Sequence, residues 1–572
     1  MFVRTATRKN KDGTVVRYLQ LAHNEWDPAT KSAKMKVLHN FGREDQLDRA
    51  AVERLVASLC RLLDPERAAI VRAPGELTYI GSAAYGGTYL LDQLWRRLRI
   101  DSITKGMLTR TRRGPYTERV LFALVANRAL DPSSKLAASH WVGRTAHIDA
   151  LSECSDDACY RAMDWLHDVR DAIEKKVFDE VANLLNLQVD LLFFDTTSTY
   201  FEIDEPDEIV DRDERGIPLP HSADAEADAE PAQRKAFRAL GKSKDHRDDL
   251  PQIVIGLAVT RDGIPVRVWC WPGGTADSEL IRQAKSDMRE WTLAKIVWVG
   301  DRGFASSANR RYLRTGDHHY IIGEKLRSGS PEAKAALSRQ GRYQEVASNL
   351  KVKEVRISES DRFVICFNPE AAERDQAIRE RLVTQLSELI DGTDTWPVTK
   401  RAELRGVIST KPGLNRYLRV TAGGLLRIDQ ARIKAETNLD GKYLLRCSDP
   451  KMSTEDIAMG YKQLWQVERG WRDMKSIIDL RPVYHRLEQR IRAHVVLCWL
   501  ALLLIRVIET ATGMTWQRIR AEFDQLTIAT FTGPTGAFAQ TAELTKLQRD
   551  ILAKLDISAP KKIVEAIPAT GA

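Results

Sequence analysis

The sequence contains few cysteines and no apolar run long enough to cross a membrane. Only 7 cysteines occur among 572 residues, and none stands in a C-x-x-C pair. This argues against a disulfide framework or a cysteine-based zinc site and predicts a reduced, cytoplasmic protein. The most membrane-like run, residues 495–505, is too short and ends at Arg506, so we expect a buried helix and no membrane partner. The opening residues MFVRTATRKNKDG lack the apolar core of a signal peptide.

A strong excess of either charge is also absent. The chain has 87 Lys and Arg against 79 Asp and Glu, for a formal net charge of +8. This balance permits a polyanionic partner without requiring one. The length predicts about three or four domains, at roughly 150 residues per domain.

Residues 1–45 are predicted to form a basic β-ribbon. FVRTATR and TVVRYLQLAH flank the turn KNKDG, and AKMKVLHNFG supplies a third strand. Two interpretations remain open, a small solvated sheet and a surface that contacts the DNA backbone. The basic residues are Arg4, Arg8, Lys9, Lys11, Arg17, Lys34 and Lys36.

Residues 46–185 are predicted to be helical, because apolar residues recur at three- and four-residue spacing. Arg110, Arg112 and Arg113 stand beside a helix start and are candidate contacts to DNA. The turn DPSSK, at 131–135, could join two helices into a helix-turn-helix reader. A plain packing bundle is favoured over that interpretation.

Residues 186–335 have an α/β pattern with several adjacent strands. The stretch 202–244 interrupts them, and its density of Asp, Glu and Ala predicts a solvent-exposed, disordered insert. Residues 336–450 again carry strands, RFVICFN and YLLRCS, around a charged surface helix at 370–390. We expect helices at 451–510, beginning with a cap at Ser453 or Thr454 and running on through 478, and at 511–572.

Two carboxylates are predicted to follow apolar strands. Asp195 ends LLFFD and Asp301 ends IVWVGD. A buried lone carboxylate is costly unless it is compensated, and ligand chemistry in an open α/β sheet collects at strand ends. Alone, each aspartate is more often a turn former. Together they could share a divalent cation, and hard oxygen ligands suit Mg²⁺ or Mn²⁺.

A third carboxylate, Glu468, lies on the expected helix. Tyr461, Glu468 and Lys475 follow one another at intervals of seven residues. Because seven residues make about two helical turns, the three side chains are predicted to share one helix face. Glu468 could hold a metal there, while Lys475 and Tyr461 touch a phosphate. A solvated helix face is the plain alternative, but the strand–strand–helix order and the residue types agree with a site.

These residues resemble the DDE transposases of bacterial insertion sequences, in the group with the signature Y-x2-R-x3-E-x6-K. The chain reads YKQLWQVERGWRDMK, with Leu464 in place of the arginine. Lys462, Arg469 or Arg472 could substitute for it. The resemblance extends over residues 190–508. It rests on four segments that follow one another in the order typical of this group, namely FFDTTSTYFE, KSKDHRDDLPQIVIGLAVTRDGIPV, VWVGDRGF and RPVYHRLEQRIRAHV.

The resemblance implies an α/β multidomain chain with an RNase H-like catalytic core, 186–335 and 451–510, interrupted by a β-rich insertion at 336–450. It implies Asp195, Asp301 and Glu468 as catalytic residues and metal ligands for two Mg²⁺ or Mn²⁺ ions. The substrates would be double-stranded terminal inverted repeats and target DNA, bound by a homodimer. Whether a hairpin intermediate forms stays open.

The remaining candidates are DNA contacts. His246 and Arg247 in SKDHRDD either lie near the site or form the charged exit of the acidic insert, and RPVYHR at 481–486 is similarly open. Arg302 and Arg472 complete the predicted contacts. Metal binding by His494 and Cys498 is not expected. Two rival functions remain, a nuclease that does not join and a DNA-binding regulator with an inactive site.

Overall fold

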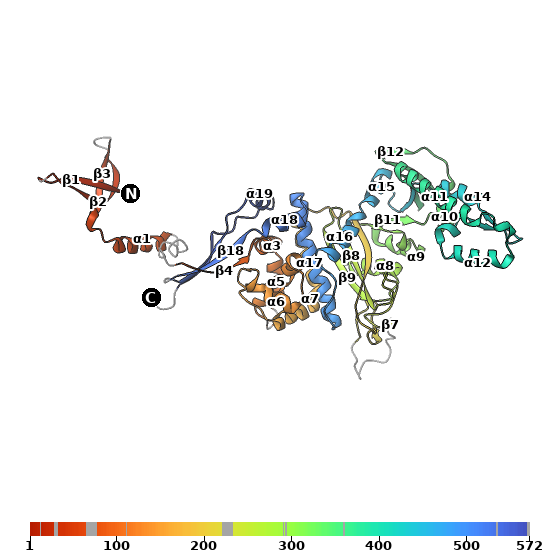
Figure 1. The fold of residues 1–572 in the computed structure, drawn as a ribbon, viewed down its shortest axis with the longest axis horizontal. Helices are drawn as coiled ribbons and strands as arrows, with labels where there is room; N and C mark the ends of the chain where they lie inside the picture. The colour runs from red at the N-terminus through yellow and green to blue at the C-terminus, as the bar shows by residue number, and fades with distance from the viewer. Residues whose placement is uncertain are drawn as a thin grey trace. The chain divides into compact units, whose positions relative to one another are not determined.

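A computed structural model describes most of the chain and divides it into two compact units. The first unit contains residues 1–85, 524–545 and 559–572, and the second contains 86–523 and 546–558 (Figure 1). The predicted DNA contacts Arg110 and Arg112 lie outside the described residues. The described residues are 1–11, 13–27, 32–63, 77–109, 111, 113–219, 233–289, 291, 295–358, 361–533 and 536–568.

The first unit begins with the predicted ribbon. Strands β1 (Phe2–Lys9), β2 (Val15–Asp27) and β3 (Ser32–Arg43) form an antiparallel sheet, which confirms three strands in this region. The 3-10 helix η1 (Glu44–Gln46) and helix α1 (Arg49–Leu63) follow. The amphipathic spacing of Val52, Leu55, Val56 and Leu59 accounts for α1.

A second sheet in this unit corrects two predictions. Its strand order is β20-β19-β18-β4, so residues 46–185 and 511–572 each contribute strands and are not helical throughout. Strand β4 pairs with β18, which lies near the other end of the chain. Local periodicity cannot show such a distant partner. The strands are β4 (Thr78–Ala84), β18 (Thr527–Gly533), β19 (Gly536–Thr541) and β20 (Ile563–Pro568).

The second unit has a helical part built around two buried helices. Helix α5 is buried from Glu118 to Leu130, as a packing bundle requires. The apolar run at 495–505 belongs to the longer helix α17, which by length and composition could cross a membrane, so the prediction that it is too short is wrong. The expected burial is confirmed, because the apolar window of α17 is completely buried inside the protein. The helices here are α3 (Gly86–Arg97), α4 (Ile100–Leu108), α5 (Tyr116–Leu130), α6 (Lys135–Arg144), α7 (Asp156–Leu184), α17 (Glu488–Thr512), α18 (Trp516–Phe523) and α19 (Lys546–Lys554).

A nine-stranded mixed sheet forms the rest of this unit, in the order β12-β13-β14-β17-β11-β10-β5-β8-β9. Strand β10 is parallel to both β5 and β11, and the other neighbours are antiparallel. The strands are β5 (Leu191–Tyr200), β8 (Gln252–Val259), β9 (Pro265–Pro272), β10 (Val297–Gly300), β11 (His319–Glu324), β12 (Gln344–Ala347), β13 (Leu350–Ser358), β14 (Asp361–Phe367) and β17 (Lys442–Cys447).

Helices cover both faces of this sheet. On one face Leu192, Phe194 and Trp298 pack with α7 and α8 (Asp277–Asp287). Successive strand residues point to opposite faces, so Leu191 and Ile321 face α15 (Thr454–Lys462), where Gly460 leaves room for both. Helix α16 (Trp465–Ser476) continues over β5 and β8 on this same face.

The predicted β-rich insertion at 336–450 is not β-rich. Its strands β12, β13, β14 and β17 extend the central sheet, and the residues between β14 and β17 are mainly helical (Figure 1). The expected charged helix at 370–390 is confirmed as α11. The elements are α11 (Pro369–Ile390), α12 (Val398–Ser409), α13 (Pro412–Asn415), β15 (Leu418–Val420), β16 (Leu426–Ile428) and α14 (Gln430–Thr437). Helices α9 (Ser307–Leu313) and α10 (Pro331–Ser338) precede them.

The acidic stretch 202–244 is partly folded, which corrects the expectation of an exposed insert. Residues 220–232 lie outside the described residues, but β6 (Val210–Arg212) pairs with β7 (Gln233–Lys235). Arg212 is buried and donates to both carboxylate oxygens of Glu488, each at 3.0 Å, and Phe237 is buried as well. The guanidinium of Arg492 lies 4.7 Å from the ring centre of Phe237. These two long-range contacts, which the composition does not reveal, anchor the stretch to α17.

Candidate active site

Asp195 lies within strand β5 and does not end it. The strand continues to Tyr200, pairing with β8 throughout, so the prediction of a strand-end position is wrong. Thr196, Thr197 and Thr199 suit a strand because their branched side chains pack well on a pleated surface. Asp195 and Thr197 share the face that α16 covers, since Lys475 of α16 bonds Thr197.

Asp301 directly follows β10 and begins the 3-10 helix η2 (Arg302–Phe304). Its Oδ1 accepts a hydrogen bond from Gly303 N at 2.7 Å. A Cβ at residue 303 would lie only 2.8 Å from that oxygen, which explains a glycine here. The turn fixes the Asp301 carboxylate at the carboxyl end of β10.

Glu468 and Tyr461 lie on separate helices, which corrects the expected single helix at 454–478. Helix α15 ends at Lys462 and α16 begins at Trp465. Glu468 is in the first turn of α16, and its side chain is exposed. The shared face predicted from seven-residue spacing therefore holds for Glu468 and Lys475, and Tyr461 reaches the site from α15.

A cavity of about 890 Å³ brings Asp301, Glu468 and Tyr461 together. Burial and the nearby carboxylates Asp301 and Glu468 raise the pKa of Tyr461 to about 12. The tyrosine approaches β11 so closely that a Cβ on Gly323 would lie 2.5 Å from its Oη. The cations lining the cavity are Arg302, Lys325, Arg327, Lys442 and Lys462.

Asp195 does not line this cavity. Its Oδ1 lies 3.7 Å from Lys244 Nζ, and Lys244 also donates to the backbone and hydroxyl oxygens of Thr196. Within the described ranges, no three His, Cys, Asp or Glu side chains form a group able to hold a metal ion. The structure thus joins two of the three predicted carboxylates in one cavity and places the third on the neighbouring strand.

Lys475 contacts Thr197, two residues from Asp195 on strand β5, in a small charged cluster. Its Nζ donates to Thr197 Oγ1 at 2.9 Å and to Asp245 Oδ1 at 3.0 Å. Arg481 NH1 lies 2.7 Å from the other oxygen of Asp245. Burial lowers the pKa of Lys475, and the Asp245 carboxylate opposes that shift.

The other predicted contacts are dispersed. Arg302 lines the cavity, and Arg472 is exposed on α16. Arg247 pairs with Asp249 at 2.8 Å, while His246 adopts a φ of 58°. Arg113 donates to the carbonyl of Arg161 at 2.9 Å, within the helical part.

Among possible substitutes for the signature arginine, Arg469 is engaged elsewhere. Its NH2 donates to Glu509 at 2.8 Å, whereas Lys462 lines the cavity and Arg472 is exposed. Leu464 itself is buried. Sequence reasoning missed Lys244, Asp245, Lys325 and Lys442. Only the first two had a signal, because SKDHRDD was already a candidate segment.

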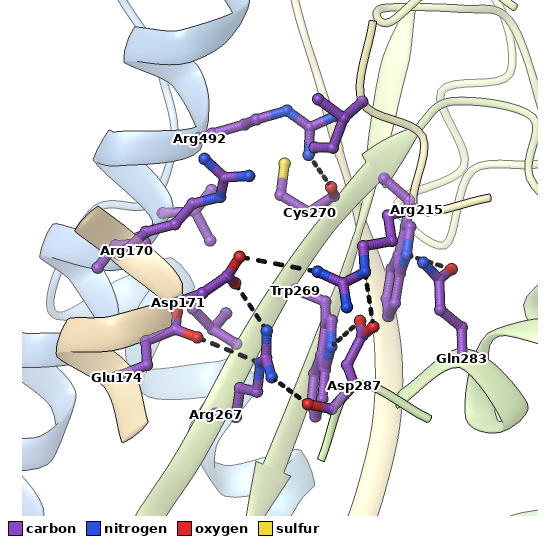
Figure 2. Close-up of a pocket in the computed structure, with 15 residues that line it drawn as sticks. Arg170, Asp171, Glu174, Arg215, Arg267, Trp269, Cys270, Gln283, Asp287 and Arg492 are labelled. Atoms are coloured by element: carbon purple, nitrogen blue, oxygen red, sulfur yellow. Dashed lines mark hydrogen bonds and ion pairs between the residues drawn. The ribbon is translucent and has the colours of Figure 1, made fainter. Parts of the chain in front are cut away.

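A smaller cavity of about 50 Å³ lies between α7, β9, α8 and α17, and Figure 2 shows the ion pairs around it. Arg267 bridges Asp171 at 2.7 Å and Glu174 at 3.3 Å, and Arg215 pairs with Asp287 at 3.0 Å. Burial raises the pKa of Glu174 to about 8. Because Arg267 lies on β9 and its two carboxylate partners lie on α7, these ion pairs link α7 to the sheet.

Comparison with known proteins gives two family matches. The model described as "IS1634 family transposase, N-terminal domain" matches residues 3–69, and that described as "Transposase DDE domain" matches residues 204–504, more than half of the chain. A similar solved structure is the cryo-EM structure of a piggyBac transposase synaptic complex with hairpin DNA. It has 10% identity and a TM-score of 0.34, over 76% of this chain and 79% of that one. No curated protein matches significantly.

Proposed function

Because the chain belongs to the DDE transposases of insertion sequences, we propose that it cuts the ends of such an element and joins the freed 3′-hydroxyl to target DNA. The observation that carries this proposal is the pair Asp301 and Glu468 in one cavity, with Asp195 at the matching position of the adjacent strand. The family acts on DNA, so double-stranded element ends and target DNA are the proposed substrates.

An RNase H-like core is the proposed catalytic scaffold. The order β9-β8-β5-β10-β11 supports it, since three antiparallel strands in chain order are followed by two strands parallel to the first. Asp195 then lies on the first strand, Asp301 follows the fourth, and Glu468 lies on a later helix. The catalytic assignment of these three residues rests on that arrangement and on the resemblance.

The family generally uses divalent metal ions, and we propose Mg²⁺ or Mn²⁺, two ions, for this chain. The donor chemistry fits, because Asp195, Asp301 and Glu468 offer only hard oxygen ligands. Asp301 and Glu468, which line one cavity, would hold the ions together with Asp195 of β5. Such ions activate an attacking oxygen and stabilise the leaving oxygen of an in-line displacement.

The side chains around the carboxylates would hold the DNA strand. Arg302 and Lys462, which line the cavity, and Lys475, which contacts Thr197, would bind phosphate oxygens. Water then attacks the phosphodiester at the element end and releases a 3′-hydroxyl, which attacks a target phosphodiester. Each step exchanges one P–O bond for another, and no protein residue becomes covalently attached.

Further contacts complete the proposal. Tyr461, Arg472, His246, Arg247 and Arg113 are proposed to contact DNA outside the reacting group. The basic sheet β1–β3 and the helical region after it are proposed to read the element ends. Synapsis of two ends calls for a homodimer.

Incubating the purified chain with a labelled element end, supercoiled target DNA and Mg²⁺ tests this proposal. Joined product is expected. Cleavage without joining would favour the metal-dependent nuclease, and binding alone would favour the regulatory protein with an inactive site. Glu468→Gln should abolish both products and keep DNA binding.

A further inference from the structure

One carboxylate, Asp245, holds two cations beside strand β5. Its Oδ1 accepts from Lys475 Nζ at 3.0 Å, and its Oδ2 lies 2.7 Å from Arg481 NH1. Its side chain is only 14% exposed, in a turn between β7 and β8. Asp245 therefore fills the space between a helix α16 lysine and an arginine that follows this helix.

A hydroxyl group completes the cluster. Lys475 Nζ donates to Thr197 Oγ1 at 2.9 Å, and Thr197 is two residues from Asp195 on the same face of β5. The guanidinium of Arg481 lies 5.0 Å from the ring centre of Tyr200, further along this strand. Each of the two cations thus has a contact on strand β5 in addition to Asp245.

The arrangement matches the recognition of a phosphodiester. Two cations converge on the Asp245 carboxylate, and a hydroxyl accepts a hydrogen bond from one of them. The carboxylate carries one negative charge on two oxygens, as a phosphodiester group does. A carboxylate in that position is a chemical substitute for the DNA backbone. A carboxylate and a phosphodiester each carry one negative charge, so their exchange preserves the charge balance around the two cations.

We propose that Arg481 and Thr197 join Lys475, a phosphate contact in the proposed function, to bind one phosphodiester of the strand being cut, and that Asp245 occupies this position until DNA displaces it. This inference rests on the proposed function, because it takes DNA as the ligand. Asp245 then lowers DNA affinity, and its removal strengthens binding.

Salt titration of DNA binding tests the proposal, using the full chain and an element-end duplex without divalent metal. Asp245→Asn frees two cations, so we expect about fivefold tighter binding at physiological ionic strength and a log–log salt slope steeper by about one to two. Asp190→Asn is the matched control. It frees Arg261 from a bidentate pair, at 2.9 and 2.6 Å, at the opposite end of β5.

Further variants locate the effect. Lys475→Ala or Arg481→Gln in the Asp245→Asn background should remove the gain, and Asp245→Glu should bind like the wild type. Unchanged binding by Asp245→Asn would overturn the proposal, and so would weaker binding, which would make Asp245 a positioning residue. A thermal unfolding midpoint close to that of the wild type verifies folding of each variant.

A DNA-independent measurement separates this inference from the proposed function. Inorganic phosphate should raise the thermal midpoint of Asp245→Asn more than that of Asp190→Asn, and Lys475→Ala should abolish the difference. If the wild type fails to bind end DNA while phosphate still stabilises Asp245→Asn, the proposed function fails and the anion site stands. Equal phosphate effects in the two variants would overturn the anion site.

Discussion

Asp195 of β5 and Asp301, which directly follows β10, occupy matching positions in the parallel pairing of these two strands. The register pairs Val299 of β10 with Phe193 of β5, and each aspartate lies two residues further along its own chain segment. Strand β5 continues past Asp195 to Tyr200, whereas β10 ends at Gly300, so the parallel pairing and not a shared strand end aligns the two acids. Two acids far apart in the sequence thereby become neighbours, on the face that carries α15 and α16.

The first prediction concerns the carboxylates themselves. Asp301→Asn or Glu468→Gln should lower the rate of element-end cleavage by at least about a thousandfold, because the charge that holds a cation is lost. DNA binding should change little. Cleavage of a labelled duplex and a binding titration measure the two effects.

Glu455→Gln provides the control, since it removes a carboxylate from the first turn of the neighbouring helix α15. Its cleavage rate should equal that of the wild type. If Glu468→Gln cleaved DNA at the normal rate, Glu468 would be an ordinary solvent-exposed side chain of α16 and not a metal ligand.

The second prediction concerns the contact between Gly323 and Tyr461. Gly323→Ala should slow cleavage and destabilise the fold by about 1–3 kcal/mol, because the new Cβ would lie 2.5 Å from Tyr461 Oη. Tyr461→Phe in the same chain should restore part of the stability, since the next atom, Cζ, lies at 3.2 Å. Chemical denaturation measures both changes.

Gly406→Ala is the matched control, because nothing lies within 4 Å of a Cβ in that helix position. It should stabilise the protein by about 0.5–1 kcal/mol. If Gly323→Ala behaved in the same way, Tyr461 would not be held against β11.

The third prediction concerns pH. Burial, with Lys135 and Arg128 nearby, lowers the pKa of His485 to about 3, and burial lowers that of His494 well below its usual value. In the unfolded chain both titrate near about 6.5, so the unfolded state binds more protons below that pH. Stability should fall on acidification below about pH 6.5, by up to about 1.4 kcal/mol per pH unit for each histidine.

Denaturation at a series of pH values from neutral to mildly acidic measures this slope. His485→Gln should flatten it, whereas replacing the exposed His140 should not. If the dependence of stability on pH were the same in His485→Gln as in the wild type, His485 would not be a source of the acid sensitivity.

The fourth prediction concerns the buried pair between β6 and α17. Glu488→Gln should destabilise the protein by about 3–5 kcal/mol, because it leaves the buried Arg212 without its charge partner. Asp394→Asn breaks an exposed bidentate pair with Arg427 and should have a smaller effect. Chemical denaturation measures both changes. If Glu488→Gln and Asp394→Asn lowered the free energy of unfolding equally, the pair with Glu488 would not anchor β6.

Local sequence patterns predicted much of the fold around the site. Apolar runs located β5, β8, β9 and β10, because buried strands need continuous apolar residues. Spacing placed Glu468 and Lys475 on one helix face. The break between α15 and α16 was missed, since Gln463 and Leu464 are compatible with a continuous helix.

Long-range pairing accounts for most of the other errors. The sheet β4–β18 and the addition of β14 and β17 to β11 depend on partners far apart in the chain. The anchoring of Arg212 by Glu488 and the clamp of Lys475 and Arg481 on Asp245 are likewise invisible to periodicity. Such contacts follow from the fold and not from local composition.

Anomalous diffraction from crystals of the protein with element-end DNA and Mn²⁺ tests the central claim most directly. The account predicts manganese in contact with the carboxylates of Asp195, Asp301 and Glu468, beside the scissile phosphodiester. Manganese bound elsewhere, or DNA seated away from this cavity, would contradict it.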